Sequence, residues 1–402
     1  MTYIEPGTTD YKRARIALFI AGLVPFISIY TTQPTMPLLA EEFNVSAPVA
    51  SLSLSMTTGL LAFTLLAAGT ISDYIGMKKI MVLSMILTSI LGVLSTLSPN
   101  FYTLLLFRTL LGVFVAGVPS IAMAFIGRTF NPLHTSMIMG FYIAGSSIGG
   151  MSGRILTGIL TDFFNWRIAI ASIGILTLML SLVFMYTLPA SQPHKTKKLS
   201  WGAIWGAYKM HLTNRRLTPL FILGFLLMGS FVSIYNYIGF LLTQPPYNLS
   251  QTIIGFVFIV YLCGTFSSIY MGKKASVYGE PFILKLSFAI TIFGTLLTLF
   301  PGVIFKIIGL SIFTFGFFAS HSIVSALVTE LAGINKAQAS SLYLLFYYLG
   351  TSLVGSVGGY FWESLHWVGV ISFNLCLLGV GLAIIFVRDY KEKHREHSSA
   401  SM

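Results

Sequence analysis

Four ionisable side chains stand out among those that lie inside or beside long apolar stretches, where burying a charge is costly. They are Arg108, Arg154, His321 and Glu330. An uncompensated charge in hydrocarbon costs at least about 2.5 kcal/mol, so each is a candidate for a chemical role. A neutral imidazole can stay buried and take up a proton near physiological pH, and a guanidinium can bind an anionic group. We therefore predict proton exchange at His321, with Arg108 and Glu330 as further candidates, and we assign Arg154 to a binding cavity.

Each of these residues also has a structural interpretation. Either arginine could brace neighbouring helices or extend its guanidinium toward the membrane surface, and His321 could bond to a neighbouring hydroxyl. Glu330 follows His321 by nine residues, which is about two and a half helical turns, so the two face opposite sides of one helix. We therefore favour a cap or gate for Glu330 over a proton carrier.

Uncharged polar and aromatic groups in two other apolar stretches complete the candidate cavity. Tyr30 and Gln33 lie in the first stretch, which contains no Asp or Glu, and Tyr235 and Asn236 lie in the seventh. Aromatic and amide groups mixed in this way suit a small polar or amphiphilic molecule better than a bulky lipophile.

The elements that must position these residues are transmembrane helices. Of the 402 residues, 55% are apolar and only 9% are charged, whereas soluble domains carry roughly 25% charged residues. Two cysteines inside apolar stretches predict no disulfide framework. The carboxylates are scattered and form no catalytic or metal-binding constellation, so we expect no enzyme, no cofactor and no metal.

Twelve stretches are long enough to cross a hydrocarbon core about 30 Å thick. They lie at approximately residues 16–38, 49–71, 80–98, 102–126, 136–160, 168–188, 219–243, 251–271, 281–300, 302–328, 338–362 and 367–387. With both termini in the cytoplasm, 20 of the 24 Lys and Arg fall in cytoplasmic segments, as the positive-inside rule requires. The net charge of +12 is thus loop charge, and it predicts no nucleic-acid partner.

Two internal matches at nearly equal offsets indicate a duplication. Residues 141–153 and 346–358 share the pattern FYxxGxSxxGxxG at an offset of 205, and residues 69–76 match 272–279 more weakly at an offset of 203. Parallel repeats of this kind are known in transporters. We predict an N-terminal six-helix bundle at residues 1–189, a cytoplasmic linker at 190–216, and a C-terminal six-helix bundle with a short basic tail at 217–402. A short amphipathic helix at the membrane surface and a solvated segment are both compatible with the linker.

Two glycine-containing motifs fall inside the repeats. The first is the loop after the second stretch, with Gly69, Asp73, Gly76, Lys78 and Lys79. Its charges could contact the ends of neighbouring helices and hold one state closed, so we interpret it as a gating motif.

The second motif is a glycine ladder in the fifth stretch, formed by Gly145, Gly149, Gly150 and Gly153. Small residues at this spacing let two helix backbones approach closely. We expect a helix-packing motif that also forms a sliding surface between the two halves.

These motifs resemble those of the major facilitator superfamily over essentially the whole chain. The loop at residues 69–79 and the pattern Arg108-x3-Gly112-x4-Gly117 resemble its motifs after helix two and in helix four, and residues 145–153 resemble the helix-five motif of the drug/proton antiporter branch. That branch has a proline where this chain has Ile148. Further short stretches resemble a group of bacterial inner-membrane transport proteins.

The resemblance implies a secondary transporter of two six-helix bundles in the bacterial inner membrane. We expect a monomer that exports a small polar or amphiphilic molecule, either a drug-like solute or an opine-type metallophore, with protons as the coupling ion. Uptake or efflux of a sugar or organic acid is the alternative.

Overall fold

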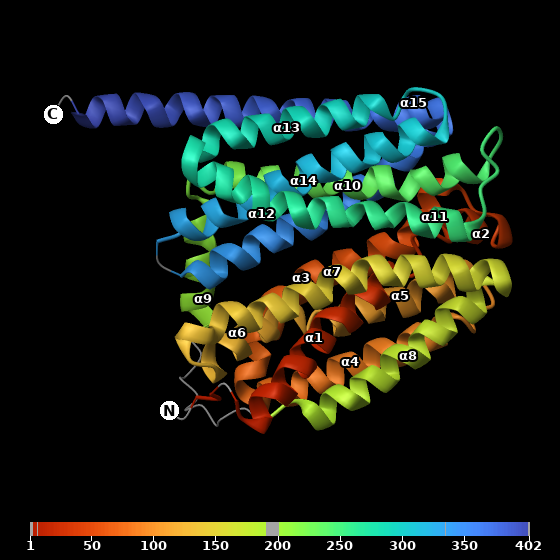
Figure 1. Cartoon of the computed structure of the whole chain (residues 1–402), viewed down its shortest axis with the longest axis horizontal. Coiled ribbons are helices and arrows are strands. Elements are labelled where there is room, and N and C mark those ends of the chain that lie inside the picture. Colours follow the sequence, from red (N-terminus) through yellow and green to blue (C-terminus); the bar gives the residue numbers. More distant parts are fainter. Residues whose placement is uncertain (1–2, 6, 190–200, 334, 401–402) are drawn as a thin grey trace. The chain divides into compact units, whose positions relative to one another are not determined.

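The computed structural model describes residues 3–5, 7–189, 201–333 and 335–400 (Figure 1). Within these ranges the chain is helical with no strand, apart from an isolated bridge between Ile4 and Phe130. This is the expected architecture for a chain in lipid, because an α-helix satisfies its backbone hydrogen bonds internally.

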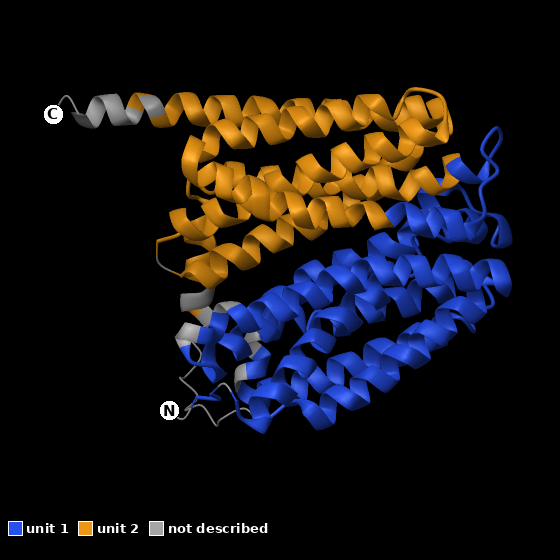
Figure 2. Cartoon of the chain, in the orientation of Figure 1, with its two compact units in different colours: residues 1–199, 242–258 blue, residues 200–241, 259–402 orange. Residues whose placement is uncertain are grey.

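The helices group into two compact units (Figure 2). Unit 1 comprises residues 1–199 and 242–258, and unit 2 comprises residues 200–241 and 259–402. The grouping follows contacts and not chain order, because residues 242–258 belong with the first unit. The division into an N-terminal bundle that ends at residue 189 and a C-terminal bundle that begins at residue 217 stays a prediction.

Unit 1 contains most helices of the first half of the chain. They are α1 (Thr9–Tyr30), α2 (Met36–Glu42), α3 (Ala47–Ile75), α4 (Met77–Ser95), α5 (Phe101–Val115), α6 (Pro119–Thr129), α7 (Pro132–Phe163), α8 (Trp166–Thr187) and, from the second half, α11 (Gln251–Val257).

Unit 2 contains the helices that follow residue 200, apart from α11. They are α9 (Trp201–Leu212), most of α10 (Thr218–Thr243), most of the 3-10 turn η1 (Phe258–Val260), α12 (Tyr261–Tyr278), α13 (Glu280–Leu297), α14 (Val303–Leu331) and α15 (Lys336–Ala400). α9 lies within the predicted linker and is fastened to this unit by a hydrogen bond of 3.1 Å between His211 Nε2 and the Asn335 carbonyl.

Polar side chains begin several of these helices. Thr8, Asn100, Asn165 and Ser250 each accept a hydrogen bond from a backbone N–H in the first turn of α1, α5, α8 and α11, respectively. Such caps satisfy N–H groups that have no partner inside the helix.

Three of the predicted apolar stretches are interrupted. The first stops at Tyr30 and resumes at Met36, the fourth is interrupted between Val115 and Pro119, and the eighth contains the 3-10 turn Phe258–Val260. Proline at the start of a new helix explains the second interruption, since it lacks an N–H. In α15 the backbone leaves helical geometry at Leu365 and His366, between the predicted eleventh and twelfth stretches.

Ten helical stretches among the described residues are long and apolar enough to cross a membrane, and one of them is the kinked segment Lys336–Glu392. The total of twelve spans stays a prediction, because helix length and composition alone do not fix it.

The glycine ladder packs α7 against α1 within unit 1. A Cβ on Gly145 would lie 2.1 Å from the Phe19 carbonyl oxygen, and one on Gly149 would lie 2.4 Å from that of Leu23. Gly153 is similarly close to Ile27, whereas a Cβ on Gly150 would meet only the Arg154 side chain. Three of the four glycines thus face a helix of their own unit, and the expected sliding surface between the two halves stays a prediction.

Candidate functional site

The end of α1 inside the first unit exposes backbone carbonyls that need hydrogen-bond donors. Arg108 of α5, which is fully buried, supplies them. Its Nη1 donates to the Ser28 carbonyl at 3.0 Å, its Nη2 donates to the Ile29 carbonyl, and its Nε donates to the Ser53 carbonyl of α3 at 2.9 Å. A cation at a helix C-terminus is also favoured by the helix dipole. Arg108 therefore fixes where α1 stops.

The backbone of α5 is close enough to α3 to allow this contact because Gly112 has no side chain. A Cβ there would lie 2.2 Å from the Thr57 carbonyl oxygen. Thr57 in turn donates its hydroxyl to the Arg108 carbonyl at 2.9 Å. Arg108 and Gly112, four residues apart on α5, thus both contribute to the contact between α5 and α3.

Three predicted cavity residues come together where α1 is interrupted. Gln33 lies in the break, and its Oε1 accepts a hydrogen bond of 2.7 Å from Nε of Arg154 in α7. The Arg154 guanidinium lies 3.8 Å from the ring centroid of Tyr30, the last residue of α1, and 4.7 Å from that of Phe258. Arg154 also donates to the Gly150 carbonyl. Arg154 and Gln33 are each 1% exposed, so Arg154 is a buried cation and does not extend to the surface.

The predicted candidates of the second half lie in unit 2. Nδ1 of His321 in α14 is 2.7 Å from the hydroxyl of Tyr343 in α15. The imidazole is half-buried, and its ring centroid lies 4.7 Å from that of Tyr347 and 6.0 Å from that of Phe317. Glu330 is exposed near the end of α14.

An aromatic cluster continues from His321 toward α10. Phe317 stacks on Phe231 with centroids 4.0 Å apart, and Phe231 lies 4.8 Å from Tyr235. The Tyr235 hydroxyl is 2.6 Å from Thr314 Oγ1. Asn236 points to a different partner, the Gly355 carbonyl at 3.4 Å. The two adjacent cavity candidates therefore serve different contacts.

The loop motif is described in part. Gly76 has a φ of +102° and joins α3 to α4, a backbone conformation that glycine adopts without steric cost. Lys78 donates to the carbonyl of Leu188, which ends α8, and Lys79 is exposed. The environments of Gly69 and of the Asp73 side chain are not described, so the gating interpretation stays a prediction.

Sequence reasoning missed a second polar contact, at the C-terminal end of α7. Asp162 lies beyond the predicted end of the fifth stretch, and its two carboxylate oxygens accept hydrogen bonds from the backbone N–H groups of Gln251 at 2.9 Å and Thr252 at 2.7 Å. Gly158 makes room for α11, because a Cβ there would lie 2.3 Å from the Gln251 carbonyl oxygen. The available signal was a further glycine and an acid continuing the ladder of α7.

The pKa of Asp162 follows from this contact. Partial burial acts to raise the pKa of the carboxyl, but hydrogen bonds from Thr252, Ser250 and Gln251 outweigh it and hold the pKa below its ordinary value. The carboxylate is therefore ionised at neutral pH and caps α11 as an anion.

No group of three or more His, Cys, Asp or Glu residues that could hold a metal ion occurs in the part of the chain that the structure describes. The clustered polar groups are instead a guanidinium with an amide in unit 1, and an imidazole with phenols in unit 2.

Comparison with known proteins places these features in context. Residues 18–355 match the family model described as Major Facilitator Superfamily. The chain is 44% identical over 382 residues to the uncharacterized MFS-type transporter YybF of Bacillus subtilis, covering 95% of each chain. It is 41% identical to the inner membrane transport protein YnfM of Escherichia coli, covering 95% of this chain and 92% of the relative. The predicted resemblance is confirmed.

Solved structures agree on the fold. A bacterial homologue of the human lysosomal transporter Spinster, in an inward-facing and unoccupied conformation, superposes with a TM-score of 0.78 at 14% identity, over 96% of this chain and 98% of that one. A variant of the nucleoside transporter NupG superposes with a TM-score of 0.77 at 15% identity, over 95% of this chain and 99% of that one. The predicted helical membrane fold is confirmed.

The role assigned to Arg108 predicts a loss of stability when its donors are removed. Arg108→Met leaves the carbonyls of Ser28, Ile29 and Ser53 without these bonds and should destabilise the protein by about 3 kcal/mol. Thermal unfolding in detergent measures this effect. Arg13→Met, at an exposed position of α1, is the matched control and should unfold like the wild type. Equal stability of both variants would contradict the role.

The Asp162 cap predicts a local effect on amide exchange. Asp162→Ala should raise hydrogen–deuterium exchange of the Gln251 and Thr252 amides about tenfold, because each loses its acceptor. Asn165→Ala, which removes the α8 cap, should leave those two amides unchanged.

The pH dependence of this cap has a definite sign. A carboxyl with a lowered pKa stabilises the fold above its unfolded pKa of about 3.9 and loses that contribution as pH falls through the folded value. The protection factors at the start of α11 should therefore be constant from about pH 8 to 5 and fall only in stronger acid. A decline already between pH 7 and 5 would show that the capping carboxylate is not Asp162.

Proposed function

Because the chain belongs to the major facilitator superfamily, and is thus a membrane transporter, we propose that it is a proton-coupled secondary transporter that exports a small polar or amphiphilic organic molecule by alternating access. The substrate class we favour carries an anionic group, as an opine-type metallophore or an anionic drug-like solute does. The alternative is a porter for a sugar or organic acid.

The observation that carries the substrate class is the Arg154 cluster. A guanidinium is held by Gln33 and lies over the ring of Tyr30, at a break in a transmembrane helix. A guanidinium fork matches a carboxylate or phosphate in geometry as well as charge. Transporters commonly bind substrate where helices are interrupted, since the backbone there is available to line a cavity. These properties support recognition of an anionic group.

The proton-coupling proposal rests on His321. Imidazole titrates nearest to neutral pH among the side chains, and its partner here is the Tyr343 hydroxyl at 2.7 Å. Either group can donate in that bond when the imidazole is neutral, but a protonated imidazole can only donate. Protonation therefore fixes the direction of the bond, which supports a coupling role.

The other coupling candidates are less well supported. Arg108 donates to three backbone carbonyls and so has a role in ending α1. Glu330 is exposed near the end of α14, which supports a cap or gate at the membrane surface. We therefore assign coupling to His321 and helix bracing to Arg108.

Substitution of Arg154 tests the substrate class. Arg154→Gln should reduce transport of a carboxylate-bearing substrate at least about tenfold, because a hydrogen bond to a charged group contributes at least about 1.5 kcal/mol. Arg154→Lys keeps the charge but not the two-pronged guanidinium geometry, so its transport rate should lie between those of the wild type and Arg154→Gln. Flux in proteoliposomes, over a panel of anionic and matched neutral solutes, measures the effect.

Two controls make this result specific. Arg13→Gln, at an exposed position, should transport normally. The transport of neutral solutes should be little reduced in Arg154→Gln. If Arg154→Gln retains full transport of every anionic solute that the wild type carries, Arg154 is not a substrate residue.

Substitution of His321 tests proton coupling. His321→Ala should abolish accumulation driven by a pH gradient while leaving substrate binding and exchange measurable. Tyr343→Phe keeps the ring and removes the hydroxyl, and should shift the pH dependence of accumulation. The exposed His394 provides the control variant His394→Ala.

The direction of transport is tested in inside-out membrane vesicles. In inside-out vesicles, an exporter that exchanges substrate for protons should load substrate into the lumen when the lumen is acidic, and a protonophore should stop it. Unaltered accumulation by His321→Ala would reject His321 as the coupling residue, and flux independent of the gradient would reject proton coupling itself.

A further inference from the structure

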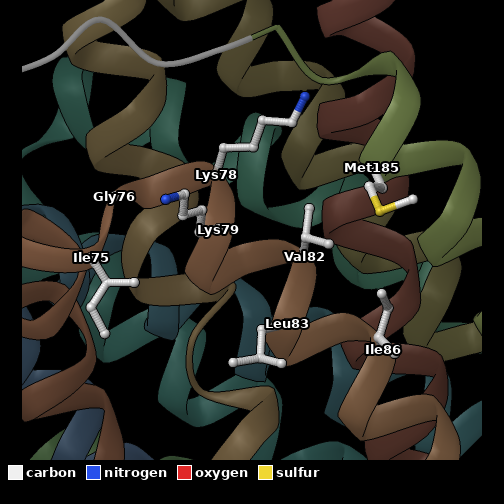
Figure 3. Close-up of a pocket in the computed structure, with 8 residues that line it drawn as sticks. All are labelled: Ile75, Gly76, Lys78, Lys79, Val82, Leu83, Ile86 and Met185. Atoms are coloured by element: carbon white, nitrogen blue, oxygen red, sulfur yellow. The ribbon is translucent and has the colours of Figure 1, made fainter.

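A pocket of about 580 Å³ lies beside the loop between α3 and α4, within unit 1 (Figure 3). Its lining combines two lysines with an apolar wall. The lining includes Lys78, Lys79, Val82, Leu83, Ile86 and Met185. The transport proposal does not use this pocket.

The order of charges and apolar groups along the pocket follows from helix geometry. Gly76 turns the chain so that α4 begins at Met77, with both lysines in its first turn. Leu83 and Ile86 follow Lys79 by four and seven residues and so lie along the same side of the helix. Figure 3 shows both lysines near the start of α4 and these apolar side chains farther along it. One end of the pocket is therefore basic and the remainder is apolar.

The apolar part of the pocket is open at the protein surface. Leu83 and Ile75 are each 52% exposed, although they belong to long apolar helices of a membrane protein. In such a chain, exposed leucine and isoleucine side chains face lipid. The lysines lie at the end of the span, on the side that we predict to be cytoplasmic, where phospholipid headgroups are found.

We infer that this pocket binds an anionic glycerophospholipid. Its phosphate would lie at Lys78 and Lys79, and an acyl chain would follow Leu83 and Ile86. Basic pockets between transmembrane helices at the cytoplasmic side recognise headgroups in this way. A soluble anion would gain nothing from the apolar wall, and a lipid without net charge would gain little from the lysines.

The repeat provides an internal comparison. At the offset of 203, Gly279, Glu280 and Pro281 stand where the first half has Gly76, Met77 and Lys78. The second half therefore carries an acid and no lysine at the first turn. Its nearest lysine, Lys285, stands at the place of Val82 and pairs with Asp389. The pair of lysines at the start of the helix is thus particular to the first half.

Lipid binding here would also affect helix packing. Lys78 donates to the carbonyl of Leu188 at the end of α8, so it already joins α4 to α8. A phosphate at the same ammonium group would contact a lysine that fastens two helices. Bound lipid is therefore expected to raise the thermal stability of the protein.

Native mass spectrometry of the full chain, released from detergent, tests the proposal. The probes are phosphatidylglycerol and phosphatidylcholine of identical acyl chains. Phosphatidylglycerol should be retained more strongly, and Lys78→Gln/Lys79→Gln should weaken it about thirtyfold, or about fivefold for each lysine. Lys79→Gln alone spares the bond to Leu188, so it reports on binding even if the double variant is unstable.

The matched control is Lys273→Gln/Lys274→Gln, which removes the same charge from α12 in the other unit. It should bind phosphatidylglycerol like the wild type. Equal loss in this control would show that overall charge, and not the pocket, holds the lipid, and would overturn the proposal.

A second pair of variants separates a lipid site from a free-anion site. Leu83→Ala should weaken phosphatidylglycerol binding, whereas Leu286→Ala, at an exposed position of α13 in the other unit, should not. Millimolar inorganic phosphate should not displace the lipid. Displacement by phosphate, together with no effect of Leu83→Ala, would identify a simple anion site and reject the lipid.

Discussion

The first unit depends on how the end of α1 is satisfied inside the protein. A helix that stops within a membrane protein leaves carbonyl groups that lipid cannot pair. Arg108 pairs with two of them, at Ser28 and Ile29, and the Gln33 backbone N–H donates to the Tyr30 carbonyl at 3.2 Å. The last three carbonyls of α1 therefore have donors from the protein. The cost of burying a guanidinium is offset because its donors meet carbonyl dipoles at the negative end of a helix.

The break in turn places the candidate binding groups. Because α1 ends at Tyr30, the Gln33 side chain can turn toward α7 and meet Arg154. The distance from α7 to α1 is fixed by the glycine ladder, where any side chain at Gly145 or Gly149 would collide with the backbone of α1. Close packing and the polar cluster thus depend on the same two helices. A larger residue in the ladder would move Arg154 as well as the helix.

The two units carry different chemistry, although the sequence contains an internal repeat. The buried arginines and the amide of Gln33 lie in the first unit, whereas the second unit contains His321 within a cluster of phenols and phenyl rings. Guanidinium groups keep their charge at any physiological pH, whereas an imidazole changes it. Under the proposed function, the first unit would bind an anion and the second would respond to protons.

The sequence by itself determined the helical membrane fold, the approximate helix positions and the family, because lipid requires long apolar helices and leaves little choice of architecture. It also placed Tyr30, Gln33 and Arg154 among the candidate cavity residues, together with Tyr235 and Asn236. Only the tertiary structure decided that Arg108 ends α1, that the ladder faces α1, and that Asp162 caps α11. Hydropathy cannot reveal these contacts, since it records how apolar a segment is and not which distant backbone groups lack a partner. Those partners are fixed only when the helices pack.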